Sequence, residues 1–169
     1  MFRWFGFVNY TPFTRVSDFA TWLKDGFIMA SRCRGCGESS FPPRADCAAC
    51  MGREFDFVEI SGRGVLHSFT GIVAAPSGFH SQAPYTLGLV DLAEGGRALA
   101  GFGATIDEAS IAIGMSLQLV PHIVEDSEEI KVLYRLERPG TRWSRVGSIA
   151  AGARIAPRSA AASPEEARR

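Results

Sequence analysis

Four cysteines are the residues of this 169-residue chain with the clearest capacity for chemistry. They form two Cys-x2-Cys pairs separated by ten residues, and they are Cys33, Cys36, Cys47 and Cys50. Each pair can place two sulfurs on one metal ion, and the glycine that follows lets the turn close without a β-carbon clash. Four thiolates complete a tetrahedral site that leaves no position for substrate or water. The expected role of the metal is therefore structural, with binding coupled to folding.

Two disulfides or four free thiols are the other interpretations of these cysteines. Iron in a rubredoxin-type site also takes the same four ligands. The cysteines are so close in sequence that disulfides among them would close only small loops. Nothing else in the sequence indicates electron transfer. We therefore predict one structural zinc ion.

Little other chemistry remains if zinc occupies all four thiols, because no cysteine is then free to act as a nucleophile. His67 and His122 fall in predicted strands as surface or core residues, and His80 lies in a long loop. Asp107 and Glu108 are interpreted as acids at the start of a helix. The sequence has no Gly-x-Ser-x-Gly motif, phosphate-binding loop or dinucleotide fingerprint. We expect no catalytic residue in this chain.

A short helix precedes the cysteines and should help to position them. Its N-cap is Ser17 or Thr14, and Asp25-Gly26 is a natural C-terminal stop. One face of the helix carries the apolar residues Phe19, Trp22 and Leu23.

After the cysteines, β-favouring runs alternate with glycine-rich turns. They predict six strands, at 56–60, 64–73, 85–92, 97–104, 116–122 and 129–136. Glu94-Gly95-Gly96 is a tight hairpin connection, and residues 106–114 are a short helix or turn that covers the end of the sheet. The chain is therefore expected to be mainly β, with an N-terminal helix and a rubredoxin-like zinc ribbon followed by a small OB-fold β-barrel. Periodicity alone does not separate this barrel from an SH3-like one.

We divide the chain into an aromatic N-terminal arm with the helix (1–30), a zinc ribbon (31–55), the barrel (56–138) and an Arg- and Ala-rich C-terminal extension (139–169). Six aromatic residues lie in the first thirteen positions, where they either cover the domain's own core or dock on another subunit. The candidate partner anchors are Trp4, Phe5 and Phe7. The extension is expected to be flexible, and either to become ordered on a partner or to have no role.

Composition narrows the classes of function. The chain is 46% hydrophobic and 21% charged, with a mean hydropathy of +0.05, which is typical of a globular protein. Residues 1–138 carry twelve Lys and Arg against sixteen Asp and Glu, which argues against nucleic-acid binding unless the C-terminal arginines supply a positive surface. No apolar run approaches the roughly 20 residues of a membrane span. With no signal peptide in the sequence, we expect a cytoplasmic protein that binds no membrane.

The order of the motifs carries a resemblance to a known family. Arg32-Cys33-x-x-Cys36-Gly37 follows the helix, and then come Phe41-Pro42-Pro43-Arg44, Cys47-x-x-Cys50, Gly62-x-Gly64 and Pro84-Tyr85. Over residues 15–137 this arrangement resembles the acyl-CoA-associated proteins with an N-terminal zinc ribbon and a C-terminal OB-fold, called domain of unknown function 35. The resemblance implies that the four cysteines are structural zinc ligands.

The resemblance also implies a non-catalytic subunit of a hetero-oligomer. Its partner is a thiolase, which supplies the nucleophilic cysteine, and the barrel helps to form the acyl-CoA channel. Such chains look like small subunits of thiolases that act on aromatic 3-ketoacyl-CoA compounds such as benzoylsuccinyl-CoA. Other members accompany a hydroxymethylglutaryl-CoA synthase or a hydratase.

We expect CoA or acyl-CoA at the partner interface. The candidate residues for this channel or interface are Phe79, His80, Tyr85 and Arg44. The plainer interpretations are an ordinary loop around residue 80 and a solvated arginine at 44. The alternative function for the whole chain is a nucleic-acid-binding module, because a zinc ribbon joined to a barrel also serves single-stranded binding.

Overall fold

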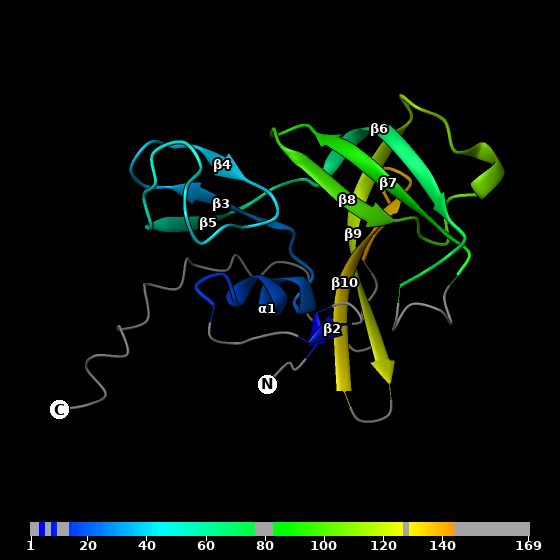
Figure 1. Cartoon of the computed structure of the whole chain (residues 1–169), viewed down its shortest axis with the longest axis horizontal. Coiled ribbons are helices and arrows are strands. Elements are labelled where there is room, and N and C mark those ends of the chain that lie inside the picture. Colours follow the sequence, from blue (N-terminus) through cyan, green and yellow to red (C-terminus); the bar gives the residue numbers. More distant parts are fainter. Residues whose placement is uncertain (1–3, 6–7, 10–13, 77–82, 127–128, 144–169) are drawn as a thin grey trace.

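The computed structural model describes residues 4–5, 8–9, 14–76, 83–126 and 129–143. A three-stranded sheet and a seven-stranded sheet make up most of it (Figure 1). The small sheet has the order β4-β3-β5, with β3 at Met29–Cys33, β4 at Ser39–Ser40 and β5 at Phe55–Glu59. The large sheet has the order β2-β1-β10-β9-β6-β7-β8, and its strands are β1 (Trp4–Phe5), β2 (Val8–Asn9), β6 (Arg63–Ile72), β7 (Tyr85–Leu92), β8 (Arg97–Gly101), β9 (Ser116–Asp126) and β10 (Glu129–Glu137).

Strands β6 to β10 curve until the two ends of their sheet approach each other. β6, β7 and β8 are successive antiparallel neighbours, and β9 pairs with both β6 and β10. Where the ends meet, Phe102 forms a parallel bridge with Leu136, and the N–H of Gly103 donates to the Leu136 carbonyl at 2.8 Å. The mainly β fold class predicted from the sequence is confirmed.

The strands follow the hydrophobic pattern: the bounds of β5, β6 and β10 differ from the prediction by one residue, and only β8 and β9 differ by more. Along β7, Gly88, Val90 and Leu92 are buried and the residues between them are partly exposed, as one buried face requires. β8 ends before the predicted residue 104 because Phe102 turns away to bridge β10. β9 continues four residues beyond His122 and therefore contains Pro121, which has no N–H to donate. Gln118 is the last β9 residue that pairs with β6, so Pro121 removes no hydrogen bond between β9 and β6.

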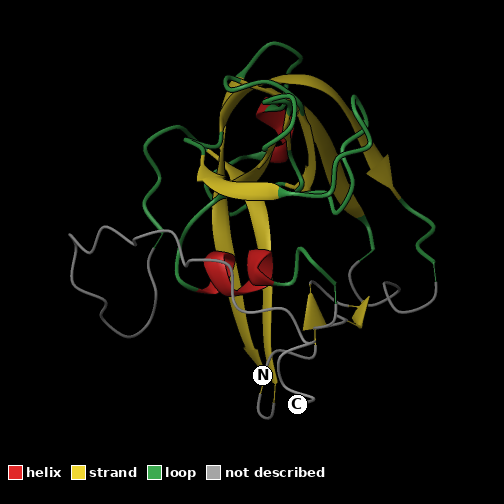
Figure 2. Cartoon of the chain, turned by 90° about the vertical axis from the view of Figure 1, so that its left-hand side faces the viewer, coloured by secondary structure: helices red, strands yellow, loops and turns green. Residues whose placement is uncertain are grey.

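Helix α1 (Asp18–Lys24) lies across β9 and β10 (Figure 2) and buries Phe19, Ala20 and Leu23. These residues belong to one core that continues into both sheets. The predicted helix is thus confirmed, and its buried face includes Phe19 and Leu23, as their spacing in the sequence indicated. The predicted acids at 107 and 108 also start a helix, the short 3-10 turn η2 (Glu108–Ser110), where the Asp107 carboxylate accepts from the Ala109 N–H.

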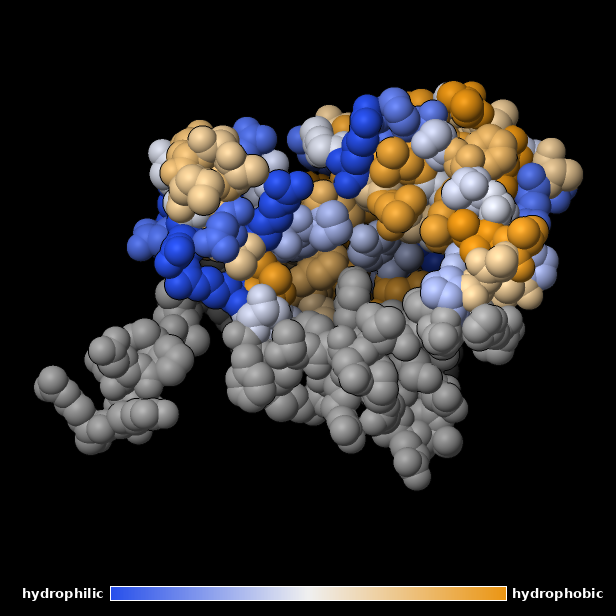
Figure 3. Space-filling model, viewed as in Figure 1, coloured by the Kyte–Doolittle hydropathy of each residue, from blue (hydrophilic) through white to orange (hydrophobic). Residues whose placement is uncertain are grey.

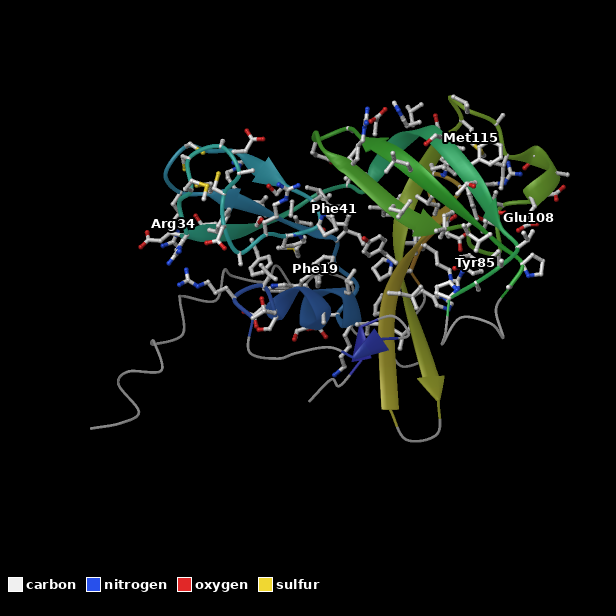
Figure 4. All side chains as sticks on the ribbon, in the orientation of Figure 1. Phe19, Arg34, Phe41, Tyr85, Glu108 and Met115 are labelled. Atoms are coloured by element: carbon white, nitrogen blue, oxygen red, sulfur yellow. The ribbon has the colours of Figure 1, made fainter. Side chains whose placement is uncertain are left out.

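Three aromatic rings join the helix, the small sheet and the barrel, and we call them the ring cluster: Phe19, Phe41 and Tyr134. Phe41 lies between the two cysteine pairs in sequence and is only 6% exposed. Its ring centroid is 5.9 Å from that of Phe19 in α1 and 5.5 Å from that of Tyr134 in β10 (Figure 4 labels Phe19 and Phe41). Burial in this cluster raises the pKa of Tyr134 to about 12.

Phe41 also lies close to the turn that precedes β8. A β-carbon placed at Gly96, just before β8, would lie 3.9 Å from the Phe41 nitrogen. The segment between the cysteine pairs therefore packs between the start of β8 and β10.

Both ends of the described chain return to the folded part. β1 pairs in parallel with β10, at Trp4↔Lys131 and Phe5↔Val132, so the backbone of the N-terminal arm extends the large sheet. Past β10, Trp143 lies against the end of α1, because a β-carbon at Gly26 would be 2.7 Å from its ring. Residues 144–169 of the predicted extension lie outside the described residues. Within the described part, no helix is both long enough and apolar enough to span a bilayer.

We predict that Phe41→Ala lowers the free energy of unfolding by about 3–5 kcal/mol, since it removes a buried ring from a packed core. Urea unfolding of the metal-loaded protein, followed by far-UV circular dichroism, measures the change. Val73→Ala is the control: Val73 is 83% exposed, and its loss should cost less than about 0.5 kcal/mol. Equal costs for the two variants would show that the ring cluster does not join the two sheets.

Candidate metal centre

The four cysteine sulfurs meet at one point beside the small sheet. Their Sγ atoms all lie within 4.8 Å of one another, and the pairs Cys33–Cys50 and Cys36–Cys47 are each 3.6 Å apart. Zinc–sulfur bonds of about 2.3 Å in a tetrahedron place neighbouring sulfurs about 3.8 Å apart. A disulfide would bring them to about 2.05 Å, and all four cysteines are free thiols. The donor set therefore fits a single tetrahedral ion and does not fit two disulfides.

The two cysteine turns are built by the same backbone hydrogen bonds. In the first, the Gly37 N–H donates to the Cys33 carbonyl at 2.9 Å. In the second, the Met51 N–H donates to the Cys47 carbonyl at 3.0 Å. The N–H groups of Cys33 and Cys47 donate in turn to the carbonyls five residues ahead. Each turn thus fixes its two sulfurs on one side through the backbone.

One detail of the sequence interpretation is wrong. The residue that needs a positive φ follows the second cysteine of each pair, and it is Gly37 (φ +78°) in the first turn but Met51 (φ +59°) in the second. Gly52 has a different function: a β-carbon there would lie 3.2 Å from Cys50 Sγ and 3.3 Å from Cys33 Sγ. Gly52 therefore leaves room for the sulfurs and does not close the turn.

The environment of the thiols separates their pKa values. Backbone N–H groups of Cys50 and Ala49 lower the pKa of Cys47 to about 7. The Glu38 N–H also lowers the pKa of Cys36. The neighbouring thiols of Cys50 and Cys47 outweigh this effect and raise the pKa of Cys36 to about 12. Four thiolates this close repel one another, so a cation is needed for all of them to ionise at neutral pH.

Arginine–carboxylate pairs surround the two turns. Arg34 Nη2 lies 2.6 Å from Asp56 Oδ1 of β5, and Arg53 Nε lies 3.2 Å from Asp46 Oδ1. All four side chains are at least half exposed, so each pair adds little to stability. Arg44 stands apart from them: its backbone N–H donates to the Ser31 hydroxyl at 3.0 Å, and its residue is exposed.

Of the other predicted site residues, Tyr85 and Arg44 are described, and they lie apart. Tyr85 begins β7 at the far end of the barrel from Arg34 and the sulfurs (Figure 4), whereas Arg44 is attached to the small sheet. Phe79 and His80 lie outside the described residues. Of the partner-anchor candidates, Trp4 and Phe5 have their backbone in β1, and Phe7 is also outside the described residues.

One polar cluster was missed by the sequence analysis. His67 Nδ1 lies 2.8 Å from Asp91 Oδ2, and Arg97 Nε donates to Asp91 Oδ1 at 2.6 Å. Asp91 and Arg97 face each other across the β7–β8 hairpin, which the turn at Gly95-Gly96 could have indicated. His67 had no such signal, because it occupies the bulge between Leu66 and Ser68. Chiefly the Arg97 bond, and to a lesser degree the His67 bond, lower the pKa of Asp91.

The fold and the four-cysteine site define a class: a rubredoxin-like zinc ribbon joined to an OB-fold barrel. The family model for the ChsH2 rubredoxin-like zinc ribbon domain matches residues 23–56, and that for the ChsH2 C-terminal OB-fold domain matches residues 57–122. The "DUF35 domain-containing scaffold protein" of Methanocaldococcus jannaschii is 31% identical over 109 residues, which cover 63% of this chain and 77% of the relative. The chain belongs to the DUF35 family.

Two further similarities are to proteins whose names place them in enzymes of more than one chain. The chain is 36% identical over 74 residues to the "Benzoylsuccinyl-CoA thiolase subunit BbsA" of Thauera aromatica, a match that covers 44% of this chain and 50% of that subunit. Among solved structures, a chain of the "Ltp2-ChsH2(DUF35) aldolase" superposes with a TM-score of 0.59 at 26% identity. That match covers 75% of this chain and 98% of the other.

We predict that Gly52→Ala destabilises the protein by about 1–3 kcal/mol, because the new methyl group crowds two sulfurs and overpacks the centre. Gly35→Ala is the matched control, since its β-carbon would lie at ordinary contact distances of 3.6 and 3.7 Å from Cys50 and Cys33. Thermal unfolding followed by circular dichroism compares the two variants. A Gly35→Ala protein that melts as low as the Gly52→Ala protein would contradict the proposed function of Gly52.

Proposed function

We propose that this chain is a zinc-binding, non-catalytic subunit of a heteromeric enzyme that acts on acyl-CoA thioesters in the cytoplasm. Its partner is a thiolase-type subunit, which carries the nucleophilic cysteine. In this complex the chain stabilises the partner and helps to form the acyl-CoA channel. An aromatic 3-ketoacyl-CoA such as benzoylsuccinyl-CoA is our candidate substrate.

The observation that carries this proposal is the convergence of every cysteine in the chain on one point. A thiolase reaction needs a thiolate that attacks the 3-keto carbonyl, so that the bond between C2 and C3 breaks and acetyl-CoA leaves. The acyl group held on that sulfur as a thioester then passes to a second CoA, which regenerates the thiolate. Here Cys33 and Cys47 are 1% and 2% exposed, and all four sulfurs are arranged as ligands. The nucleophile must therefore come from another polypeptide.

Zinc would be held by Cys33, Cys36, Cys47 and Cys50. It would fix the two cysteine turns and the segment between them as a closed structural site. That segment contains Phe41, which reaches α1 and β10. The metal thus has a clear function in this chain without any contact to substrate.

The similarities favour the same function. The relatives in Methanocaldococcus jannaschii and Thauera aromatica are named as a scaffold protein and as a thiolase subunit. The similar solved structure is named as an aldolase in which a DUF35 chain is combined with Ltp2. A family that recurs in multi-subunit enzymes fits a chain with its own fold and no nucleophile. Phe79, His80, Tyr85 and Arg44 remain our candidates for the channel or the interface.

We predict one zinc ion per chain and its loss in Cys47→Ser, because three thiolates hold zinc far more weakly than four. Inductively coupled plasma mass spectrometry of the purified protein measures the metal. Ala48→Ser, an exposed change inside the same turn, should keep full occupancy. Affinity should also fall as the pH is lowered, by about tenfold per pH unit for each proton that zinc displaces. Iron in place of zinc, or full occupancy of Cys47→Ser, would refute this assignment.

We predict that thiolysis of a 3-ketoacyl-CoA requires both chains. The chain is co-expressed with a thiolase-type protein from the same genome, and CoA-dependent cleavage of acetoacetyl-CoA and benzoylsuccinyl-CoA is followed by mass spectrometry of the acyl-CoA products. The complex should be active, and this chain alone should have no turnover. Replacing it by Cys47→Ser should reduce assembly with the partner. Turnover by the isolated chain, or no stable complex, would contradict the proposed function.

A further inference from the structure

The four cysteines of the metal centre differ in their exposure to solvent. Cys36 and Cys50 are exposed, whereas Cys33 and Cys47 are only 1% and 2% exposed. Each exposed cysteine has its Sγ 3.6 Å from that of a buried one, which is Cys33 for Cys50 and Cys47 for Cys36. Figure 4 shows the sulfurs at the end of the ribbon, near Arg34 and away from the barrel. In the same orientation, Figure 3 shows that end of the molecule as a hydrophobic patch among hydrophilic residues.

Two glycines lie against the Cys33–Cys50 pair. A β-carbon placed at Gly35 would lie 3.6 Å from Cys50 Sγ and 3.7 Å from Cys33 Sγ. One placed at Gly52 would lie 3.2 Å and 3.3 Å from the same two atoms. Because neither position carries a side chain, neither shields these sulfurs from small molecules in solution.

The Cys36–Cys47 pair has side chains at the corresponding positions. The two cysteine turns have the same backbone hydrogen bonds, so their positions can be compared one by one. Ala49 stands in the second turn where the first has Gly35, and its N–H bonds to Cys47. Glu38 stands in the first turn where the second has Gly52, and its N–H bonds to Cys36. The centre is therefore asymmetric, and the Cys33–Cys50 pair is the less shielded of the two.

The arrangement of this pair suits oxidation by a peroxide. Sulfur that binds a metal is held as the thiolate, which is the form that peroxides oxidise. Susceptibility increases with exposure, and a second sulfur close by converts the first oxidation product to a disulfide. Cys50 is exposed and Cys33 Sγ is 3.6 Å from it, so the pair meets both conditions.

We propose that Cys50 is an oxidation site at which hydrogen peroxide disassembles the metal centre, with Cys33 as the second sulfur. In the first step Cys50 Sγ attacks one peroxide oxygen, the O–O bond breaks and hydroxide leaves, so the sulfur becomes a sulfenic acid. In the second step Cys33 Sγ attacks that sulfur, the S–O bond breaks and a second hydroxide leaves. Each hydroxide takes a proton from solvent. Two thiolates are thus oxidised to a disulfide, and hydrogen peroxide is reduced to water.

Oxidation of this pair removes half of the ligand set. Cys36 and Cys47 remain as thiolates, and two ligands do not complete a tetrahedral zinc site. The segment that contains Phe41 is then no longer fixed at both ends by the metal. A dithiol that reduces the disulfide should restore zinc binding. This inference goes beyond the proposed function, because it concerns the ribbon's own sulfurs and involves no partner.

The test treats the full-length zinc-loaded chain with excess hydrogen peroxide. Zinc release is followed by the absorbance of a chromophoric chelator, against the same sample without peroxide, and disulfides are mapped by mass spectrometry. Wild type should release its zinc, with Cys33–Cys50 as the first disulfide. Gly35→Ala puts a methyl group at ordinary contact distance from Cys50 Sγ and should slow the release by about threefold or more. Gly71→Ala on β6, where a β-carbon would meet nothing within 4 Å among the described residues, should release zinc at the wild-type rate.

The zinc content of each variant is measured before treatment, so that slower release cannot come from a site that was never filled. Retention of zinc by wild type in peroxide would overturn the proposal. A first disulfide between Cys36 and Cys47, or equal rates for Gly35→Ala and wild type, would overturn it as well. So would failure of dithiothreitol with added zinc to restore the metal. The proposed function stands or fails separately, in the thiolysis assay with the partner.

Discussion

The convergence of four sulfurs on one point is the constraint on which the rest of the structure depends. It requires both cysteine turns to face each other, and it therefore fixes the ends of the segment that connects them. Phe41 lies on that segment, and its ring packs against α1 and β10. A small ribbon with few core residues of its own is in this way tied to the larger barrel. The metal centre and the barrel core are consequently one folding unit.

The same arrangement limits the chemistry that the cysteines can do. Thiols that are held as metal ligands are unavailable as nucleophiles, and His67 is committed to Asp91 rather than to a hydroxyl or thiol. The described residues can still interact with other molecules through the surfaces of the ribbon and the barrel. The ribbon carries paired charges, whereas the barrel exposes Val65 and Leu99 on strands whose other side is core. A division of labour between a scaffold and a catalytic subunit is the simplest function for such a molecule.

The glycines beside the two cysteine pairs have different structural functions. The two cysteine turns have the same hydrogen bonds, yet a glycine occupies the positive-φ position in one of them and Met51 occupies it in the other. Gly52, next to Met51, is required for a different reason, since a methyl group would meet two sulfurs. The sequence showed that a glycine follows each cysteine pair. Only the tertiary structure shows that Gly37 is needed for its positive φ, whereas Gly52 is needed because a side chain would meet the sulfurs.

The sequence by itself determined the fold class, the helix, most strand positions and the ligand set, because these depend on local spacing and on the alternation of apolar residues. Cys-x2-Cys pairs and period-two patterns have few structural solutions. Tertiary structure alone decided what depends on distant contacts: the packing of Phe41 between α1 and β10, the bridge from Phe102 to Leu136, and the bulge that brings His67 to Asp91. These contacts join residues from 22 to 93 positions apart, so no local pattern records them.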